Sequence, residues 1–428
     1  MAAPVIVKVL STLGLILVVN RLAKNLMIAA AMGAVALGAW CGHGVEGIFF
    51  IAWSRLSSAD NLMLMLVIVE VLSLSTQMAR SGATNDLVHA VQSKVSRRTS
   101  LAVIPAVIGL LPMPGGAAFS APLVDDIDSK NELHPMLKTR INYWFRHIWE
   151  YWWPIYPGVA LALTITDLQP WQIMVLHLPL SAGAVLVGYI FLLRKVEDSD
   201  DAGPTKDSEN PKSILLILLP IFVVIAAYTL VYLMRSIPHF PIQHKFFPMA
   251  VGIICAMIVL QYQRPLNREM WKIVVFNKRS FHLAVLVAII VVYGAFIDAD
   301  LPDGTALVEK MSTELNEFGI PIMLVIIAIP FVAGIATGIT VAYVGAGFPI
   351  VLSLIGKDPD RAVFLSTIVL AYGSGFVGMM LSPVHVCLVV TNEHFKTQLA
   401  DSILRLSATA FGMLLLVVIY HFIIRWIF

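Results

Sequence analysis

Four apolar stretches of this chain are interrupted by glycine and proline, and the interruptions fall in pairs at matching places in its two halves. In the first half they lie at 112–124 and 152–158, and in the second half at 340–349 and 381–385. Inside a bilayer, such irregular backbone survives only where protein or water satisfies its polar groups. Paired interrupted helices in two halves are typical of secondary transporters, whose binding sites they form. The sequence therefore predicts a membrane carrier whose broken helices meet at a site.

Composition supports a protein buried in lipid. Hydrophobic residues make up 58% of the 428 residues and charged residues only 13%, which leaves too little polar surface for a soluble protein. The net charge of +2 comes without a basic patch, so we expect no nucleic-acid partner. Cys41, Cys255 and Cys387 share no ligand spacing and are predicted to be buried small residues, with no metal site and no cofactor. A cleaved signal peptide is not expected, because no basic segment precedes the first apolar run.

Segment lengths predict the topology. Two apolar stretches, 100–124 and 319–355, are predicted to be re-entrant hairpins. The expected fold is an all-α polytopic membrane protein of about ten transmembrane helices plus two re-entrant hairpins. The predicted spans are 3–20, 26–41, 60–78, 146–165, 170–193, 213–234, 246–262, 281–297, 363–390 and 404–427.

The distribution of lysine and arginine predicts the orientation. With both hairpins re-entrant, most basic residues fall on one side, which the positive-inside rule makes cytoplasmic. A full crossing at 100–124 would send the basic loop 130–146 outward. We therefore expect an inner (plasma) membrane protein with both termini outside the cytoplasm.

An odd number of crossings in each half makes the two halves inverted repeats. The first repeat is predicted at 1–196 and the second at 213–428, joined by a polar cytoplasmic linker at 197–212. Each half also carries an amphipathic surface segment, at 85–96 and at 304–318.

The interruptions supply candidate substrate-binding groups. Gly115 and Gly116 permit backbone geometries that expose N–H groups, and a helix starting after them directs positive charge at an anion. Pro154 and Pro383 free carbonyl groups in the crossing helices, unless they only kink packed helices. The substrate-binding candidates are Pro114, Gly115, Gly116, Ser120, Arg146, Tyr156, Thr340, Gly345, Gly347, Ser382 and His385.

Charged groups within the apolar stretches supply candidates for ion coupling. Arg146 and Glu150 share a helix face beside His147, either as an interfacial ion pair or as an anion contact with a proton relay. Glu70 lies in mid-span, as a coupling group or as one member of a structural pair. His385 is either a core histidine or a pocket residue. The coupling-ion candidates are Glu70, His147, Glu150 and Ser374.

Two segments carry a resemblance to known families. Residues 113–116 together with 142–150 resemble the integral-membrane family catalogued as domain of unknown function 401. The layout is similar to that of the ion-transporter superfamily of secondary carriers, which includes dicarboxylate, citrate, gluconate and arsenite permeases. This resemblance implies inverted repeats whose re-entrant hairpins and unwound helices meet near the midplane. Sodium-coupled members usually place Ser-Asn-Thr at each hairpin tip, and residues 115–120 lack it.

Together these features predict a secondary active transporter for a small organic or inorganic anion, coupled to protons or sodium, working by alternating access. Its other partners would be the lipid bilayer and, in a homodimer, a second copy. An intramembrane enzyme is the first alternative, with Ser374 of the Tyr372–Gly375 segment as nucleophile and His385 as base. A helical serine and histidine at this separation do not share a face, and no His-Glu-x-x-His zinc pattern occurs. A channel or a membrane scaffold is the second alternative.

Overall fold

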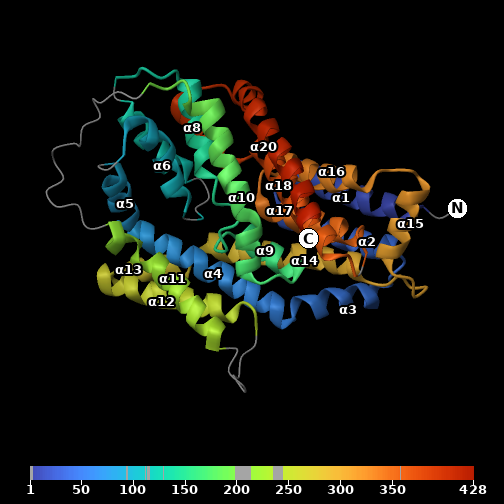
Figure 1. Cartoon of the computed structure of the whole chain (residues 1–428). Helices are drawn as coiled ribbons and strands as arrows, with labels where there is room; N and C mark the ends of the chain where they lie inside the picture. The colour runs from blue at the N-terminus through green and yellow to red at the C-terminus, as the bar shows by residue number, and fades with distance from the viewer. Residues whose placement is uncertain are drawn as a thin grey trace.

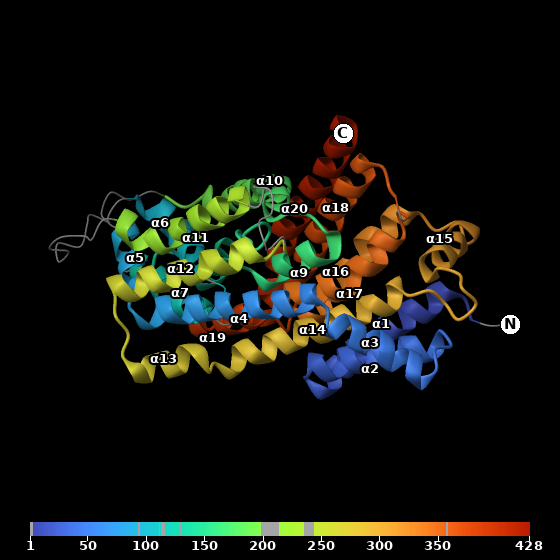
Figure 2. The same ribbon diagram turned by 90° about the horizontal axis from the view of Figure 1, so that it is seen from below.

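The computed structural model describes residues 3–92, 95–110, 112, 116–128, 130–197, 214–234, 244–356 and 358–428. Within these ranges the chain is helical, and its only β contact is an isolated bridge between Asp300 and Ala306. The molecule is elongated in Figure 2, where α4 (Ala59–Arg80) and α12 (Phe247–Gln263) run along its length, whereas α8 (Pro135–Arg146) and α10 (Pro170–Gly188) are steeply inclined to them in Figure 1. The N-terminus lies at the end formed by α1 (Val5–Ala23), α2 (Leu26–Trp40) and α15 (Leu307–Glu317).

Among the described residues, seven helical segments are long and apolar enough to cross a membrane. The three remaining predicted spans form shorter or interrupted helices: α2, α12 (Phe247–Gln263) and the 146–165 region. An all-helical membrane protein is thereby confirmed. The seven segments are α1, α4 (Ala59–Arg80), α10 with η1 (Pro170–Gly188 and Tyr189–Leu193), α11 (Ile214–Met234), α13 with α14 (Arg268–Val275 and Lys278–Asp298), α18 (Arg361–Met380) and α20 (Leu399–Ile427).

Helix interruptions occur in both halves, as predicted. Each interruption separates one helix from the next. The pairs are α6 (Arg97–Gly109) with α7 (Ala117–Ile127), α8 (Pro135–Arg146) with α9 (Pro157–Thr166), α16 (Ile322–Thr337) with α17 (Thr340–Ser353), and α18 with α19 (Val386–Phe395).

Two of these pairs fold back on themselves. Ile104 and Ile108 of α6 pack with Leu123 and Ile127 of α7. In the second half, a Cβ on Gly347 of α17 would lie 3.3 Å from the Pro330 ring of α16. Such contacts between residues on either side of a break require the second helix to run back along the first.

The position predicted for the third interruption is wrong. α17 is continuous through 340–349, and the break lies at Gly338 and Ile339 instead. Gly338 has a φ of +67°, a left-handed conformation that ends α16 and that suits glycine. Gly345 and Gly347 sit inside α17 and pack closely against Ile290 and Pro330, respectively. This packing maintains the helix although glycine has a low helix propensity.

Two helices occupy segments where the sequence predicted none. The expected loop 130–146 contains α8, which begins with Pro135 and is capped by the His134 ring accepting the Met136 N–H at 3.2 Å. A further helix, α3 (Val45–Leu56), occupies a connection for which no element was predicted. The amphipathic segments are confirmed as α5 (Ala83–Gln92) and α15.

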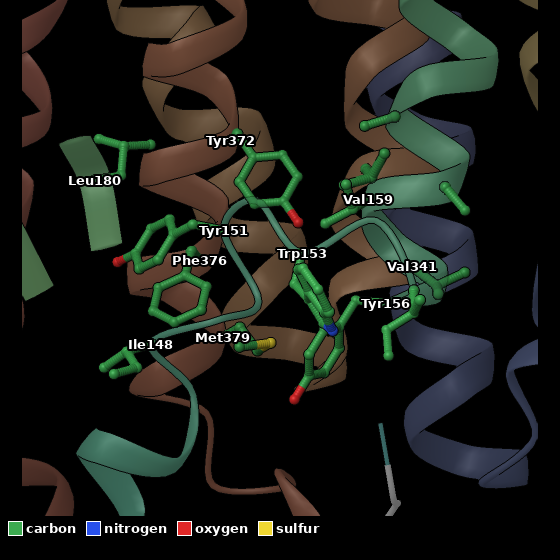
Figure 3. Packing of buried hydrophobic residues seen from close by; sticks show 14 of the residues in the cluster. Ile148, Tyr151, Trp153, Tyr156, Val159, Leu180, Val341, Tyr372, Phe376 and Met379 are labelled. Atoms are coloured by element: carbon green, nitrogen blue, oxygen red, sulfur yellow. The ribbon is translucent and has the colours of Figure 1, made fainter. Parts of the chain in front are cut away.

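The connection between α8 and α9 is a buried, non-helical segment at the centre of the core. Its Tyr151 ring lies 4.0 Å from that of Phe376 in α18. The Tyr372 hydroxyl donates to the Glu150 carbonyl at 2.6 Å, which fixes the segment to α18. Figure 3 shows Trp153 and Tyr156 of this segment between Met379 and Val341. Side chains of both halves therefore hold this irregular backbone in place.

Candidate functional site

A cavity of about 330 Å³ lies where the interruptions meet. Both halves of the chain contribute to its wall, so the cavity forms only in the assembled fold. Its lining residues are Leu72, Pro112, Arg146, His147, Glu150, Tyr156, Pro157, Gly158, Leu283, Thr337, Gly338, Ile339, Thr340, Val341, Met379, Val384, His385, Val386 and Cys387.

Three helices begin at the cavity. α9 starts at Pro157, α17 at Thr340 and α19 at Val386, and each of these residues belongs to the lining. The first N–H groups of a helix have no partner within the helix, and the helix dipole makes this end positive. Each of these three helix starts therefore favours a negatively charged ligand.

Arg146 ends α8 and carries its guanidinium into the cavity wall. Only 2% of the residue is exposed. Its Nη1 donates to the Cys387 Sγ at 3.4 Å. A Cβ on Gly116 would lie 2.2 Å from Nη2, and one on Gly109 would lie 2.0 Å from the Arg146 carbonyl oxygen. The α6–α7 pair therefore encloses this arginine at two points where only glycine fits.

A pair of histidines joins the two halves. The Nε2 atoms of His147 and His385 lie 3.0 Å apart, and both residues are buried. The Nδ1 of His147 lies 2.6 Å from the Tyr143 carbonyl oxygen, and that of His385 lies 2.5 Å from the Gly338 carbonyl oxygen. Backbone carbonyls accept hydrogen bonds only, so each Nδ1 is the donor and carries a proton.

Glu150 provides a second link between the halves. Its Oε2 accepts the Thr340 hydroxyl at 3.0 Å, and its Oε1 lies 3.8 Å from the His147 Nε2. A Cβ on Gly158 would lie 2.3 Å from the Thr340 Cγ2, so α9 and α17 begin in direct contact. Glu150 as a whole is 7% exposed and sits within the wall rather than in open water.

The structure brings several of the predicted site residues together at the cavity. Arg146, His147, Glu150, Tyr156, Thr340 and His385 line the cavity, and Gly116 backs the guanidinium. The Tyr156 hydroxyl donates to the Gly109 carbonyl, so this side chain also ties α6 to the cavity wall. Pro114 and Gly115 lie outside the described residues.

Other predicted site residues lie in the packing around the cavity. Ser382 donates to the Ile335 carbonyl at 2.6 Å, next to Gly338, and joins the two breaks of the second half. The Ser120 hydroxyl is buried and faces the Ala117 carbonyl of its own helix. Gly345 and Gly347 form helix contacts within α16, α17 and α14.

Two coupling-ion candidates also lie away from the cavity. The Ser374 hydroxyl donates to the Leu370 carbonyl of its own helix at 2.7 Å. It is not a lining residue, so the geometry gives no support to a Ser374–His385 catalytic pair. Glu70 is buried in α4, and within the described part of the chain its Oε2 has no hydrogen-bond partner.

Sequence reasoning missed the role of Cys387. Its Sγ and one ring nitrogen each of His147 and His385 all lie within 4.8 Å of one another. The sequence feature that could have indicated this role is the position of Cys387, two residues after His385 and in the first turn of the helix that follows the Pro383 break. Gly338 and Met379 were missed as lining residues because their own segments carry no charge.

Comparison with known proteins identifies a family for this chain but no activity. A search of curated proteins finds none that matches this sequence. The family model described as "Protein of unknown function (DUF401)" matches residues 6–424, nearly the whole chain. The chain therefore belongs to the DUF401 family of proteins of unknown function.

Proposed function

We propose that this protein is a secondary active transporter for a small organic or inorganic anion. The observation that carries the proposal is the cavity between the two halves, where a buried arginine and three helix N-termini meet. Transporters place substrate sites at such broken helices, near the middle of the membrane. A volume of about 330 Å³ is sufficient for a small ligand rather than for a polymer or a lipid.

The anion would bind against Arg146 and the helix starts. The guanidinium packs against Gly116 and donates to the Cys387 Sγ, and the Arg146 backbone packs against Gly109, so the position of the side chain is fixed before a ligand arrives. A planar guanidinium bonds carboxylates and oxyanions through two parallel hydrogen bonds. The N-termini of α9, α17 and α19 add positive charge without additional basic residues.

A proton or a sodium ion would couple transport to an ion gradient. Glu150 and His147 are the predicted coupling residues that face the cavity. The Glu150 carboxylate and the Thr340 hydroxyl offer oxygen atoms to sodium, whereas His147 and Glu150 offer sites for a proton. Glu70 and Ser374 would act at a distance from the substrate.

The back-folded pairs α6–α7 and α16–α17 would be re-entrant hairpins within two inverted repeats. In this arrangement one hairpin reaches the cavity from each side of the inner membrane, with both termini outside the cytoplasm. Alternating access would then move the hairpin-bearing helices against a scaffold of α1, α2, α11 and α12. The exposed apolar surface of the scaffold would face lipid or, in a homodimer, a second copy.

Thermal stabilisation of the purified protein tests anion binding. The ligand panel contains carboxylates, sugar acids, oxyanions and cations, at two pH values with and without sodium. A ligand at 100 times its Kd stabilises the folded state by about 2.7 kcal/mol. We expect one anion class to give a saturable shift that Arg146→Lys reduces strongly, because lysine cannot form two parallel bonds.

The matched control is Arg140→Lys, which changes an arginine on the same helix outside the cavity lining. This variant should retain the full shift. A panel without any shift, or a shift that Arg146→Lys leaves unchanged, would contradict the proposed anion site.

A further inference from the structure

A second kind of ligand site lies in the wall of the same cavity, formed by side chains that ligate metals. His147 and Glu150 come from the connection between α8 and α9, whereas His385 and Cys387 come from the start of α19. All four residues are buried and all four line the cavity. The sequence predicted no metal site, because ligands that lie so far apart along the chain share no recognisable spacing.

The histidine tautomers create a demand for a cation. Each Nδ1 donates its proton to a backbone carbonyl, as described above. In the neutral rings both Nε2 atoms therefore present lone pairs, and they do so 3.0 Å apart. Two facing lone pairs are stable at this distance only when a positive charge lies between or beside them. A shared proton, a hydrogen bond from the neighbouring Cys387 thiol or a metal ion can supply it.

The surrounding donors favour a metal ion. The Cys387 Sγ completes a set of three ligand atoms within 4.8 Å, and the Glu150 Oε1 lies 3.8 Å from the His147 Nε2. Two nitrogen ligands of a tetrahedral zinc ion lie roughly 3.3 Å apart, given Zn–N distances of about 2.0–2.1 Å. The observed nitrogen separation is thus close to a ligating one, and a small inward movement of the thiolate and carboxylate would close the shell.

The outer contacts are those expected of metal ligands. Ligating histidines usually donate their second ring N–H to a carbonyl or carboxylate, which fixes the ring and its tautomer. Both rings do so here, and the second oxygen of Glu150 is held by Thr340. Imidazole and thiolate together suit zinc and neighbouring transition metals, and they disfavour magnesium and calcium.

Arg146 shows how this site would relate to the anion. Its Nη1 lies 3.4 Å from the Cys387 Sγ and so stabilises the thiolate. A divalent metal would neutralise one thiolate and one carboxylate, leaving the guanidinium charge to face the cavity. Metal binding would also remove His147 and Glu150 as proton carriers, and coupling would then depend on other groups such as Glu70.

We propose that His147, His385 and Cys387, completed by Glu150, form a binding site for a transition-metal ion of the zinc class. The site joins the two halves of the chain through one ion. The proposal goes beyond anion transport and does not require it, because the donor set is complete without a substrate.

Cobalt titration of the full-length protein in detergent tests the site. After removal of metals with a chelator, Co²⁺ should bind at one ion per chain and give a thiolate-to-cobalt charge-transfer band. Zn²⁺ should displace it. Cys387→Ser should abolish the band, and His385→Gln should weaken Co²⁺ binding by at least about tenfold. Cys41→Ser, Cys255→Ser and His177→Gln are matched controls and should leave both properties unchanged.

Protection from alkylation extends the test to a protein in which Cys387 is intact. In a Cys41→Ser, Cys255→Ser background, saturating Zn²⁺ should slow alkylation of Cys387 by a maleimide at least about tenfold, since a coordinated thiolate is a weak nucleophile. Absence of the cobalt band in the unaltered protein, a band that survives Cys387→Ser, or alkylation that Zn²⁺ does not slow would each overturn the proposal. A protein that fails these tests but binds an anion would retain the transport proposal, and the reverse outcome would retain only the metal site.

Discussion

Two buried clusters of charged residues differ in how their hydrogen bonds are used. In the first, at the α6–α8 end, Arg97 and two backbone N–H groups donate to Asp128, which is fully buried, and Lys138 forms an ion pair with it at 3.4 Å. Both oxygens of this central carboxylate are engaged by the groups around it. The second cluster surrounds a cavity, and two of its imidazole nitrogens face each other with lone pairs. Saturated networks stabilise a fold, whereas a cluster of metal-ligating side chains beside a cavity is suited to binding.

Breaking the saturated network should have the largest effect on stability. Asp128→Ala leaves Arg97 and Lys138 buried without their shared partner. We expect a loss of about 3–5 kcal/mol in the free energy of unfolding. Denaturant unfolding in detergent measures it, with the exposed Asp126→Ala as control. If the network is only structural, the remaining folded protein should bind anions normally, and a selective loss of anion binding would contradict this separation.

Disturbing the cavity cluster should affect binding more than stability. Gly116→Ala places a methyl group 2.2 Å from the Arg146 Nη2 and must displace the guanidinium. We expect anion affinity to fall about tenfold or more, as for the loss of a charged hydrogen bond of about 1.5–3 kcal/mol. Gly14→Ala is the control, because a Cβ there meets no atom within 4 Å. Equal affinities for the two variants would show that Gly116 does not position Arg146.

Removing the hydroxyl that holds Glu150 should have a smaller effect. Thr340→Val keeps the side-chain shape but removes the 3.0 Å hydrogen bond to the carboxylate. We expect a loss of about 1–3 kcal/mol in unfolding free energy and weaker Co²⁺ binding. Thr164→Val is the control, because the Thr164 hydroxyl donates to the Ala160 carbonyl of its own helix. A variant that binds Co²⁺ as tightly as the unaltered protein would show that the Thr340 hydroxyl does not position Glu150 as a ligand.

The smallest effect on the free energy of unfolding should come from Asp125, a partly exposed residue at the edge of the saturated network. Burial raises the pKa of the Asp125 carboxyl, but hydrogen bonds from Lys138 and His394 outweigh it and hold the pKa below its usual value. The folded-state pKa is therefore below the unfolded value, so the stabilisation is present above about pH 4 and is lost as pH falls through the folded pKa. Because this pair is partly exposed, we expect at most about 1 kcal/mol. Unfolding measured between neutral and acidic pH should show this loss, and Asp125→Asn should remove it; an identical pH dependence in the variant would contradict the assignment.

The sequence predicted the parts of this architecture that depend on local chemistry. Glycine and proline marked the interruptions, and charge within apolar segments identified Arg146, His147 and Glu150. The break at Gly338 was misplaced because α17 is held as a helix by packing of Gly345 and Gly347, which local composition does not show. The partnership of Cys387 with His147 could not be predicted from spacing, since it exists only after the two halves assemble.

Counterflow in proteoliposomes tests the transport proposal most directly. Vesicles containing the purified protein are loaded with an anion that stabilises it, and uptake of the labelled anion is followed. A carrier predicts saturable exchange that Arg146→Lys slows strongly and Arg140→Lys does not. Flux that rises without saturation, or no exchange of an anion that binds the cavity, would contradict the account.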